Sequence, residues 1–219
     1  MKLNIGGNNL KELSNIDRIF SRVADSFNYS EGIKEIESII KRNPEFLNRE
    51  NVLLKVGMLY DHFATQQRSL QKRNIIEKKA LAFYQSALKI NPKSHGATWG
   101  IGRVWWHRKS KKAISYAKRA YLLAKQNGMD AGIYAQNVGA VYRAIGNLKR
   151  SEFWLIKGAK ESPTDWGVYL NLISFYKSIG RVNKASLYRG KLKFFFDKES
   201  KKKKDTKWGK MIKEIIREK

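Results

Sequence analysis

Apolar residues recur along this chain at intervals of three and four, in short stripes separated by polar stretches. Near the N-terminus the stripe is Ile16, Ile19, Phe20, Val23 and Phe27, and this spacing places all five side chains on one face of an α-helix. A helix with one apolar face must bury that face against a neighbour. The pattern therefore predicts an all-α chain built from many modest helices that pack on one another.

A period of 34 residues runs through the second half of the chain. The corresponding positions are Gly139 and Ile173, Tyr142 and Tyr176, Gly146 and Gly180, Ser151 and Ala185, and Leu155 and Arg189. Upstream, Gly102 with Trp105 and Gly57 with Tyr60 begin the same pattern, which insertions interrupt. A small residue at a helix crossing lets two backbones approach, an aromatic fills the space beside it, and a proline ends the second helix. The sequence thus predicts about five helix–turn–helix units.

These residues resemble the tetratricopeptide repeat family over roughly residues 13 to 197, most clearly from Ile133 to Pro163. The resemblance implies a right-handed α-solenoid whose first helices line a concave groove. The expected repeat domain is residues 1–199, with units of roughly 13–46, 47–94, 95–131, 132–165 and 166–199. The long spacer from Asp61 to Lys79 is interpreted as the continuation of a first helix.

Residues 200–219 are expected to form a basic linker followed by an amphipathic C-terminal helix. The apolar stripe of this helix is Trp208, Met211, Ile212, Ile215 and Ile216. A terminal repeat needs a cover for its exposed face, so a capping helix is the favoured interpretation. The alternative is a detachable helix that binds a partner or a membrane surface.

Charge changes this picture more than any motif does. The chain has 45 Lys and Arg residues against 19 Asp and Glu, a formal net charge of +26 that attracts anions over long range. From Lys78 to Met129 there are twelve basic residues and no carboxylate. We expect a basic patch made of Arg108, Lys109, Lys111, Lys112, Lys118, Arg119, Lys201, Lys202, Lys203 and Lys204. Each of the two basic segments in this patch, 108–119 and 201–204, is by itself equally typical of a solvent-exposed helix face.

The residue types that carry catalysis are sparse. There is no cysteine, which excludes disulfides and thiolate metal sites. The histidines His62, His95 and His107 do not pair at metal-ligand spacing, and Asp61, His62 and Glu152 are not brought together as an acid–base set by their spacing. We expect no enzyme activity, cofactor, metal or small-molecule substrate. The lack of a secretory segment or of an apolar run of about 18 residues predicts an unprocessed cytoplasmic protein.

The resemblance also implies a binding surface, because it directs first-helix side chains toward the groove. The residues of this surface are Lys55, Trp99, Arg103, Trp106, Gln136, Asn137, Arg143, Asn171 and Lys177. Arginine can bind a carboxylate or phosphate through two hydrogen bonds, amides can hold a peptide backbone, and indoles can stack on bases or apolar side chains. Trp105 and Trp106 are adjacent, so at least one indole is expected to be exposed, although core packing of Trp99 or Trp106 stays open.

The leading hypothesis is a scaffold that binds an acidic protein or peptide through Arg103, Arg143 and Lys177 in the groove. The alternative is an RNA-binding or other nucleic-acid-binding protein, with phosphates along the basic middle helices and the basic tail. Docking of the C-terminal helix on anionic lipid is a third hypothesis and ranks last, because it needs that helix to be free of the repeats.

Overall fold

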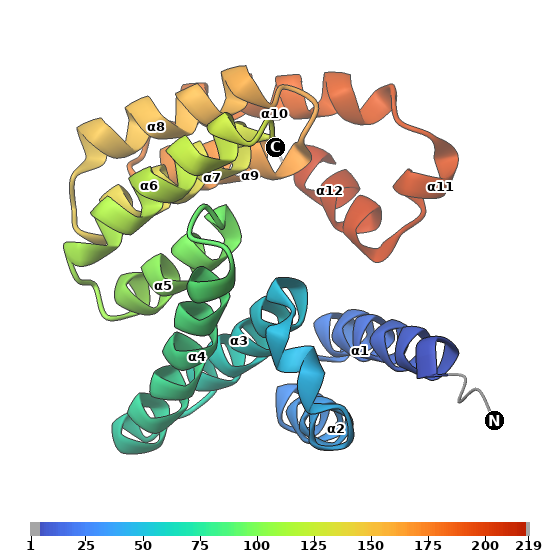
Figure 1. Cartoon of the computed structure of the whole chain (residues 1–219). Coiled ribbons are helices and arrows are strands. Elements are labelled where there is room, and N and C mark those ends of the chain that lie inside the picture. The colour runs from blue at the N-terminus through green and yellow to red at the C-terminus, as the bar shows by residue number, and fades with distance from the viewer. Residues whose placement is uncertain (1–4, 218–219) are drawn as a thin grey trace. The chain divides into compact units, whose positions relative to one another are not determined.

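The computed structural model describes residues 5–217, together with the side chains of residues 10–206 and 208–217 (Figure 1). Over these residues the secondary structure is helical and contains no strand, which confirms the predicted all-α class. The chain divides into two compact units, with the boundary between Ala120 and Tyr121. Of the predicted domains, residues 1–4 and 218–219 lie outside the described part of the chain.

The first unit is built from helices that follow one another along the chain. They are α1 (Ile5–Ser26), α2 (Tyr29–Arg42), the short 3-10 helix η1 (Pro44–Asn48), α3 (Glu50–Thr65), α4 (Leu70–Ile90) and α5 (His95–His107). The next helix, α6 (Lys112–Gln126), begins in this unit and crosses the boundary. α4 packs against both α3 and α5, so its apolar residues lie at the centre of this part of the core (Figure 1).

Tyr84 of α4 shows why small residues recur on the first helices. Its side chain is fully buried, and its ring lies against Gly57 of α3 and Gly100 of α5. A Cβ atom at Gly57 would lie 2.7 Å from the Tyr84 ring, and one at Gly100 would overlap the ring outright. The two glycines therefore form a slot that the Tyr84 ring fills; Gly57 belongs to the predicted repeat pattern, whereas Gly100 does not.

The spacer from Asp61 to Lys79 is a correction to the sequence-based interpretation. α3 ends at Thr65 and does not run on. A new helix begins at Leu70, where the Ser69 hydroxyl accepts a hydrogen bond from the backbone N–H of Lys72 at 3.4 Å. The extra residues thus lengthen the second helix of this unit at its N-terminal end, because Ser69 supplies a helix-start signal.

The second unit contains the remaining helices. They are α7 (Ala131–Ala144), α8 (Leu148–Glu161), α9 (Trp166–Ser178), α10 (Val182–Asp197), α11 (Lys201–Lys204) and α12 (Lys207–Arg217). Gly146 and Gly180, which stand one repeat apart, close α7 and α9 with φ of 81° and 69°. This left-handed conformation favours glycine, so the periodic glycines mark the turn between the two helices of each pair.

The C-terminal helix α12 packs on α10, as a cap does. Ile212 is fully buried and joins the core that contains Leu192 and Phe196. Trp208, one turn earlier, keeps 48% of its surface exposed. The helix is thus anchored through the centre of its apolar stripe, while one end of the stripe remains in solvent.

Among the helices of residues 5–217, none combines the length and the apolar character that a membrane span requires.

Candidate functional site

The residues predicted to line one groove belong to both units. Lys55 lies on α3 and Trp99, Arg103 and Trp106 lie on α5, all in the first unit. The other five lie on the first helices of the second unit: Gln136, Asn137 and Arg143 on α7, and Asn171 and Lys177 on α9.

Both predicted cations of the first unit already have a carboxylate partner. Lys55 forms an ion pair with Asp17. The Nε atom of Arg103 lies 2.9 Å from Oδ2 of Asp61, and its Nη2 atom lies 3.2 Å from Nε2 of His62. Arg103 is thus matched by an internal charge, which reduces its attraction for a ligand.

Burial controls the electrostatics around Asp61. The side chain has no exposed surface, and neither carboxylate oxygen accepts a hydrogen bond, although Arg103 lies close. Desolvation raises the pKa of Asp61 to about 6 in spite of the Arg103 charge. Desolvation, reinforced by Arg103, lowers the pKa values of His62 and His107 to about 4, so both imidazoles are neutral at physiological pH.

A second buried carboxylate stands next to this group. Glu77 has 1% of its surface exposed and accepts hydrogen bonds from Nε of Arg73 at 2.8 Å and from Nε of Arg108 at 2.7 Å. Arg108, expected in the basic patch, is therefore half of an ion pair. Together with Lys112, Arg108 also covers the ring of Trp105.

The indoles of α5 are more buried than expected. Trp105 and Trp106 are both half-buried, so the expectation of at least one exposed indole is not met at this pair. Trp106 stacks on His107, with ring centroids 5.2 Å apart, and Trp99 lies 6.3 Å from Trp106. Trp105 packs instead against the core cluster of the first unit.

Three of the predicted residues meet in the second unit. Arg143, Asn171 and Lys177 line a hollow of 650 Å³ that α12 also borders. The remaining lining residues, which the sequence analysis missed, are Leu170, Ile173, Ser174, Ser178 and Ile215. The hollow forms because α7 packs against α9, and because residues 171, 174 and 178 follow helical spacing on one face of α9.

Hydrogen bonds fix the polar wall of this hollow. Nη1 of Arg143 donates to Oγ of Ser174 at 3.3 Å, and Nδ2 of Asn171 donates to Oε1 of Gln136 at 2.5 Å. Gln136 has 3% of its surface exposed and packs against Gly158. Its position is therefore fixed, and its hydrogen bond orients the amide of Asn171. Asn137 is half-buried and does not line the hollow.

The other sequence candidates are Asp61 and His62 on α3 and Glu152 on α8. Glu152 lies in the second unit, where it accepts hydrogen bonds from Tyr176 and Lys184. Within residues 5–217 no cluster of His, Asp or Glu side chains could hold a metal ion.

The remaining residues of the predicted basic patch are surface cations, exposed except for the half-buried Lys118 and Lys204: Lys109, Lys111, Lys112, Lys118, Arg119, Lys201, Lys202, Lys203 and Lys204.

Comparison with known proteins gives likeness at the level of fold. No family model matches the chain, and no curated protein sequence matches it significantly. PilW, described as a widely conserved type IV pilus biogenesis factor, is 18% identical, with a TM-score of 0.59 over 85% of this chain and 79% of PilW. TTC0263, a tetratricopeptide-repeat protein of Thermus thermophilus, is 15% identical, with a TM-score of 0.54 over 74% of this chain and 97% of its own.

MamA of Desulfovibrio magneticus RS-1 gives a similar result. Its chain from residue 41 onward is 13% identical, with a TM-score of 0.54 over 89% of this chain and 98% of that MamA chain. At these identities the likeness concerns the fold. The tetratricopeptide-type repeat fold expected from the sequence is thereby confirmed.

Proposed function

We propose that this helical-repeat chain is a non-catalytic scaffold that holds an acidic segment of a protein partner. The hollow of the second unit makes the contact, with Arg143 and Lys177 pairing with a carboxylate. The observation that carries the proposal is the make-up of the hollow, whose eight lining residues include two cations and no carboxylate. An anion that enters would therefore be attracted by two cations and would meet no like charge on the wall.

The remaining lining residues suit an extended peptide. Because the Asn171 amide N–H bonds Gln136, its Oδ1 atom is left to accept a hydrogen bond from a peptide N–H. Leu170 and Ile215 add apolar surface to the same hollow. The proposed ligand is thus a carboxylate-bearing segment that presents an apolar side chain beside the acid.

The test is a binding titration with a labelled peptide that alternates glutamate with leucine, followed by fluorescence anisotropy at low and at physiological salt. The double variant Arg143→Gln with Lys177→Gln removes both cations of the hollow. Hydrogen bonds to charged groups contribute about 1.5 to 3 kcal/mol each, so we expect affinity to fall by about tenfold or more.

The matched control is Lys149→Gln with Lys160→Gln, two exposed lysines of α8 that do not line the hollow. This control removes the same formal charge, and we expect it to change affinity by no more than about twofold. Equal weakening by both double variants would refute the hollow as the site and attribute binding to the general positive field.

A second candidate function is nucleic-acid binding by the first unit. It is favoured by the segment from Lys78 to Ala120, which contains basic residues and no carboxylate. Lys109, Lys111 and Arg119 are exposed there. Phosphates along this surface would release counterions, so binding would weaken steeply as salt increases.

The triple variant Lys109→Glu, Lys111→Glu and Lys112→Glu tests this candidate against a labelled mixed-sequence RNA. A loss of RNA affinity together with a shallower salt dependence is the expected result. Unchanged affinity, or RNA binding that vanishes at physiological salt in the unaltered protein, removes the candidate.

A further inference from the structure

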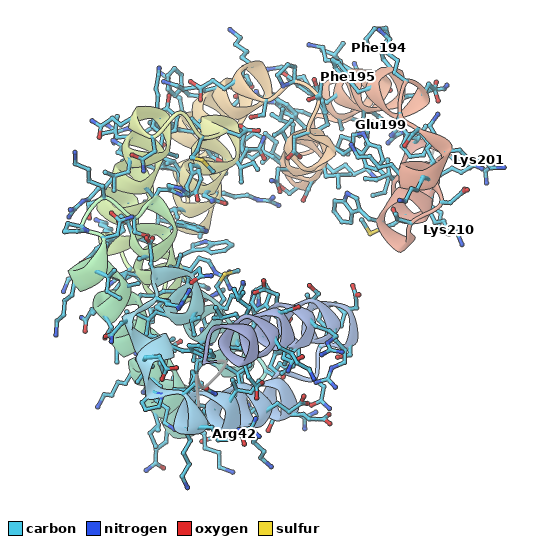
Figure 2. The ribbon with its side chains drawn as sticks, turned by 45° about the vertical axis from the view of Figure 1, so that its right-hand side comes forward. Arg42, Phe194, Phe195, Glu199, Lys201 and Lys210 are labelled. Carbon is cyan, nitrogen blue, oxygen red and sulfur yellow. The ribbon has the colours of Figure 1, made fainter. Side chains whose placement is uncertain are left out.

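A second hollow, of 380 Å³, lies where α10, α11 and α12 meet. Its lining consists of the buried ring of Phe196, one aspartate and four lysines: Asp205, Lys201, Lys204, Lys210 and Lys213. The four positive charges and one negative charge give a formal lining charge of +3. Figure 2 shows Lys201 and Lys210 on neighbouring short helices at this corner of the chain.

Local hydrogen bonds and one glycine hold the corner together. Oγ of Ser200 accepts from the N–H of Lys203 at the start of α11, and Oγ1 of Thr206 accepts from the N–H of Gly209 at the start of α12. A Cβ atom at Gly209 would lie 2.6 Å from the carbonyl oxygen of Lys203. Glycine therefore permits the close approach of α12 to α11 that brings lysines of both helices around one space.

The lysine ammonium groups of this hollow have few internal partners. Nζ of Lys204 donates to the backbone carbonyl of Asp197 at 2.7 Å, which fixes its position without neutralising its charge. In the described residues, the ammonium groups of Lys201, Lys210 and Lys213 have neither a hydrogen-bond nor an ion-pair partner. Like charges gathered in this way repel one another, and a bound anion would relieve that repulsion.

We infer that this hollow binds a multiply charged phosphate group. Lysine presents a compact charge with three donors and no planar fork, which suits phosphate oxygens approached from several directions. A phosphate monoester or a diphosphate carries more charge than one carboxylate and so better balances a lining of +3. The site is separate from the hollow of the proposed function and does not depend on it. The phosphate could belong to a soluble compound or to a lipid headgroup.

The test uses the full chain and isothermal titration with pyrophosphate at physiological salt, with a thermal melt as a second readout. Pyrophosphate is expected to bind and to raise the melting temperature. In the double variant Lys210→Gln with Lys213→Gln, affinity is expected to fall by about tenfold or more. The control Lys149→Gln with Lys160→Gln removes the same charge elsewhere in the same unit and is expected to change affinity by no more than about twofold.

Co-sedimentation with phosphatidylcholine vesicles that carry phosphatidic acid distinguishes the two sources, with pure phosphatidylcholine as the blank. Pyrophosphate binding without co-sedimentation assigns a soluble phosphate compound. Vesicle binding that the Lys210 and Lys213 double variant loses assigns a lipid headgroup. The inference is overturned if neither probe binds, or if the control loses as much affinity as the site variant. Variants of Arg143 and Lys177 should leave pyrophosphate binding intact, so failure of the proposed function would not be confused with failure here.

Discussion

Removal of Arg103 offers a sharp test of the electrostatics in the first unit. The Arg103→Met variant keeps most of the side-chain volume but leaves Asp61 fully buried without its counter-ion. Breaking a buried ion pair from one side costs about 3 to 5 kcal/mol, because the remaining charge is neither solvated nor paired. We expect a loss of this size in the free energy of unfolding at about pH 8, where Asp61 is ionised in the parent protein.

The same loss should nearly disappear in mild acid. Burial raises the pKa of Asp61 from 3.8 to about 6, so the folded state holds a proton that the unfolded state releases. Ionisation of Asp61 therefore costs the fold about 3 kcal/mol, and this cost is absent below the unfolded pKa and grows as pH rises to about 6. At about pH 5 Asp61 is mostly protonated in the folded state of both the parent and the variant. Only the packing difference between them, about 1 kcal/mol, should then remain.

His62 and His107 titrate in the opposite sense in the parent protein. Their pKa values fall from 6.5 to about 4 on folding, so the unfolded state binds protons first and stability declines as pH drops below 6.5. Arg103 contributes to both of these shifts. Its removal makes the imidazoles easier to protonate beside Asp61, which also reduces the loss in acid.

Urea unfolding followed by far-ultraviolet circular dichroism at about pH 8 and pH 5 measures the difference between variant and parent at each pH. The double variant Asp61→Leu with Arg103→Met is the control, because replacing both charges by apolar groups removes the orphaned carboxylate. It should recover most of the stability lost at high pH. Equal losses at the two pH values, or a double variant no more stable than Arg103→Met, would refute this account of Asp61.

Three further substitutions test the packing. Gly100→Ala places a methyl group in the ring of Tyr84 and should lower the free energy of unfolding by about 1 to 3 kcal/mol by chemical denaturation. Gly190→Ala, at a helical glycine with nothing within 4 Å of the added carbon, should leave stability unchanged or raise it by up to about 1 kcal/mol, so a loss there would contradict the reasoning. Ile212→Ala should lower stability by about 2 to 5 kcal/mol, and an unchanged melting temperature would show that α12 is not a cap.

The repeat fold could be predicted because its determinants are local and periodic. Gly146 and Gly180 adopt the left-handed backbone that their position after a first helix requires, and Gly57 leaves the space that Tyr84 fills. The start of α4 was missed because its signal is a single serine cap at Ser69, without the apolar stripe that marks the other starts. Periodicity locates helices well and their first residues poorly.

The candidate site could be predicted in part. Arg143, Asn171 and Lys177 meet in one hollow, as expected for side chains on successive first helices. Two contacts between residues far apart in the sequence could not be predicted from the repeat pattern. Pairing of Arg103 with Asp61 joins residues far apart in the sequence, and Ile215 reaches the hollow from the C-terminal helix. No spacing rule within one helix reveals such contacts, because they depend on how separate helices pack.

The distribution of carboxylates explains why net charge alone did not locate a binding site. Asp61 and Glu77 are buried, and they pair with arginines, namely Arg103, Arg73 and Arg108. Since acids are scarce in this chain, burying two of them leaves an outer surface dominated by lysine. The charge of an arginine paired in this way is matched by a buried carboxylate, so the arginine stabilises the folded chain and attracts an external anion less strongly. An anion site is therefore better sought where cations line a hollow that has few or no carboxylates on its wall, as between α7 and α9 and again at the corner of α11 and α12.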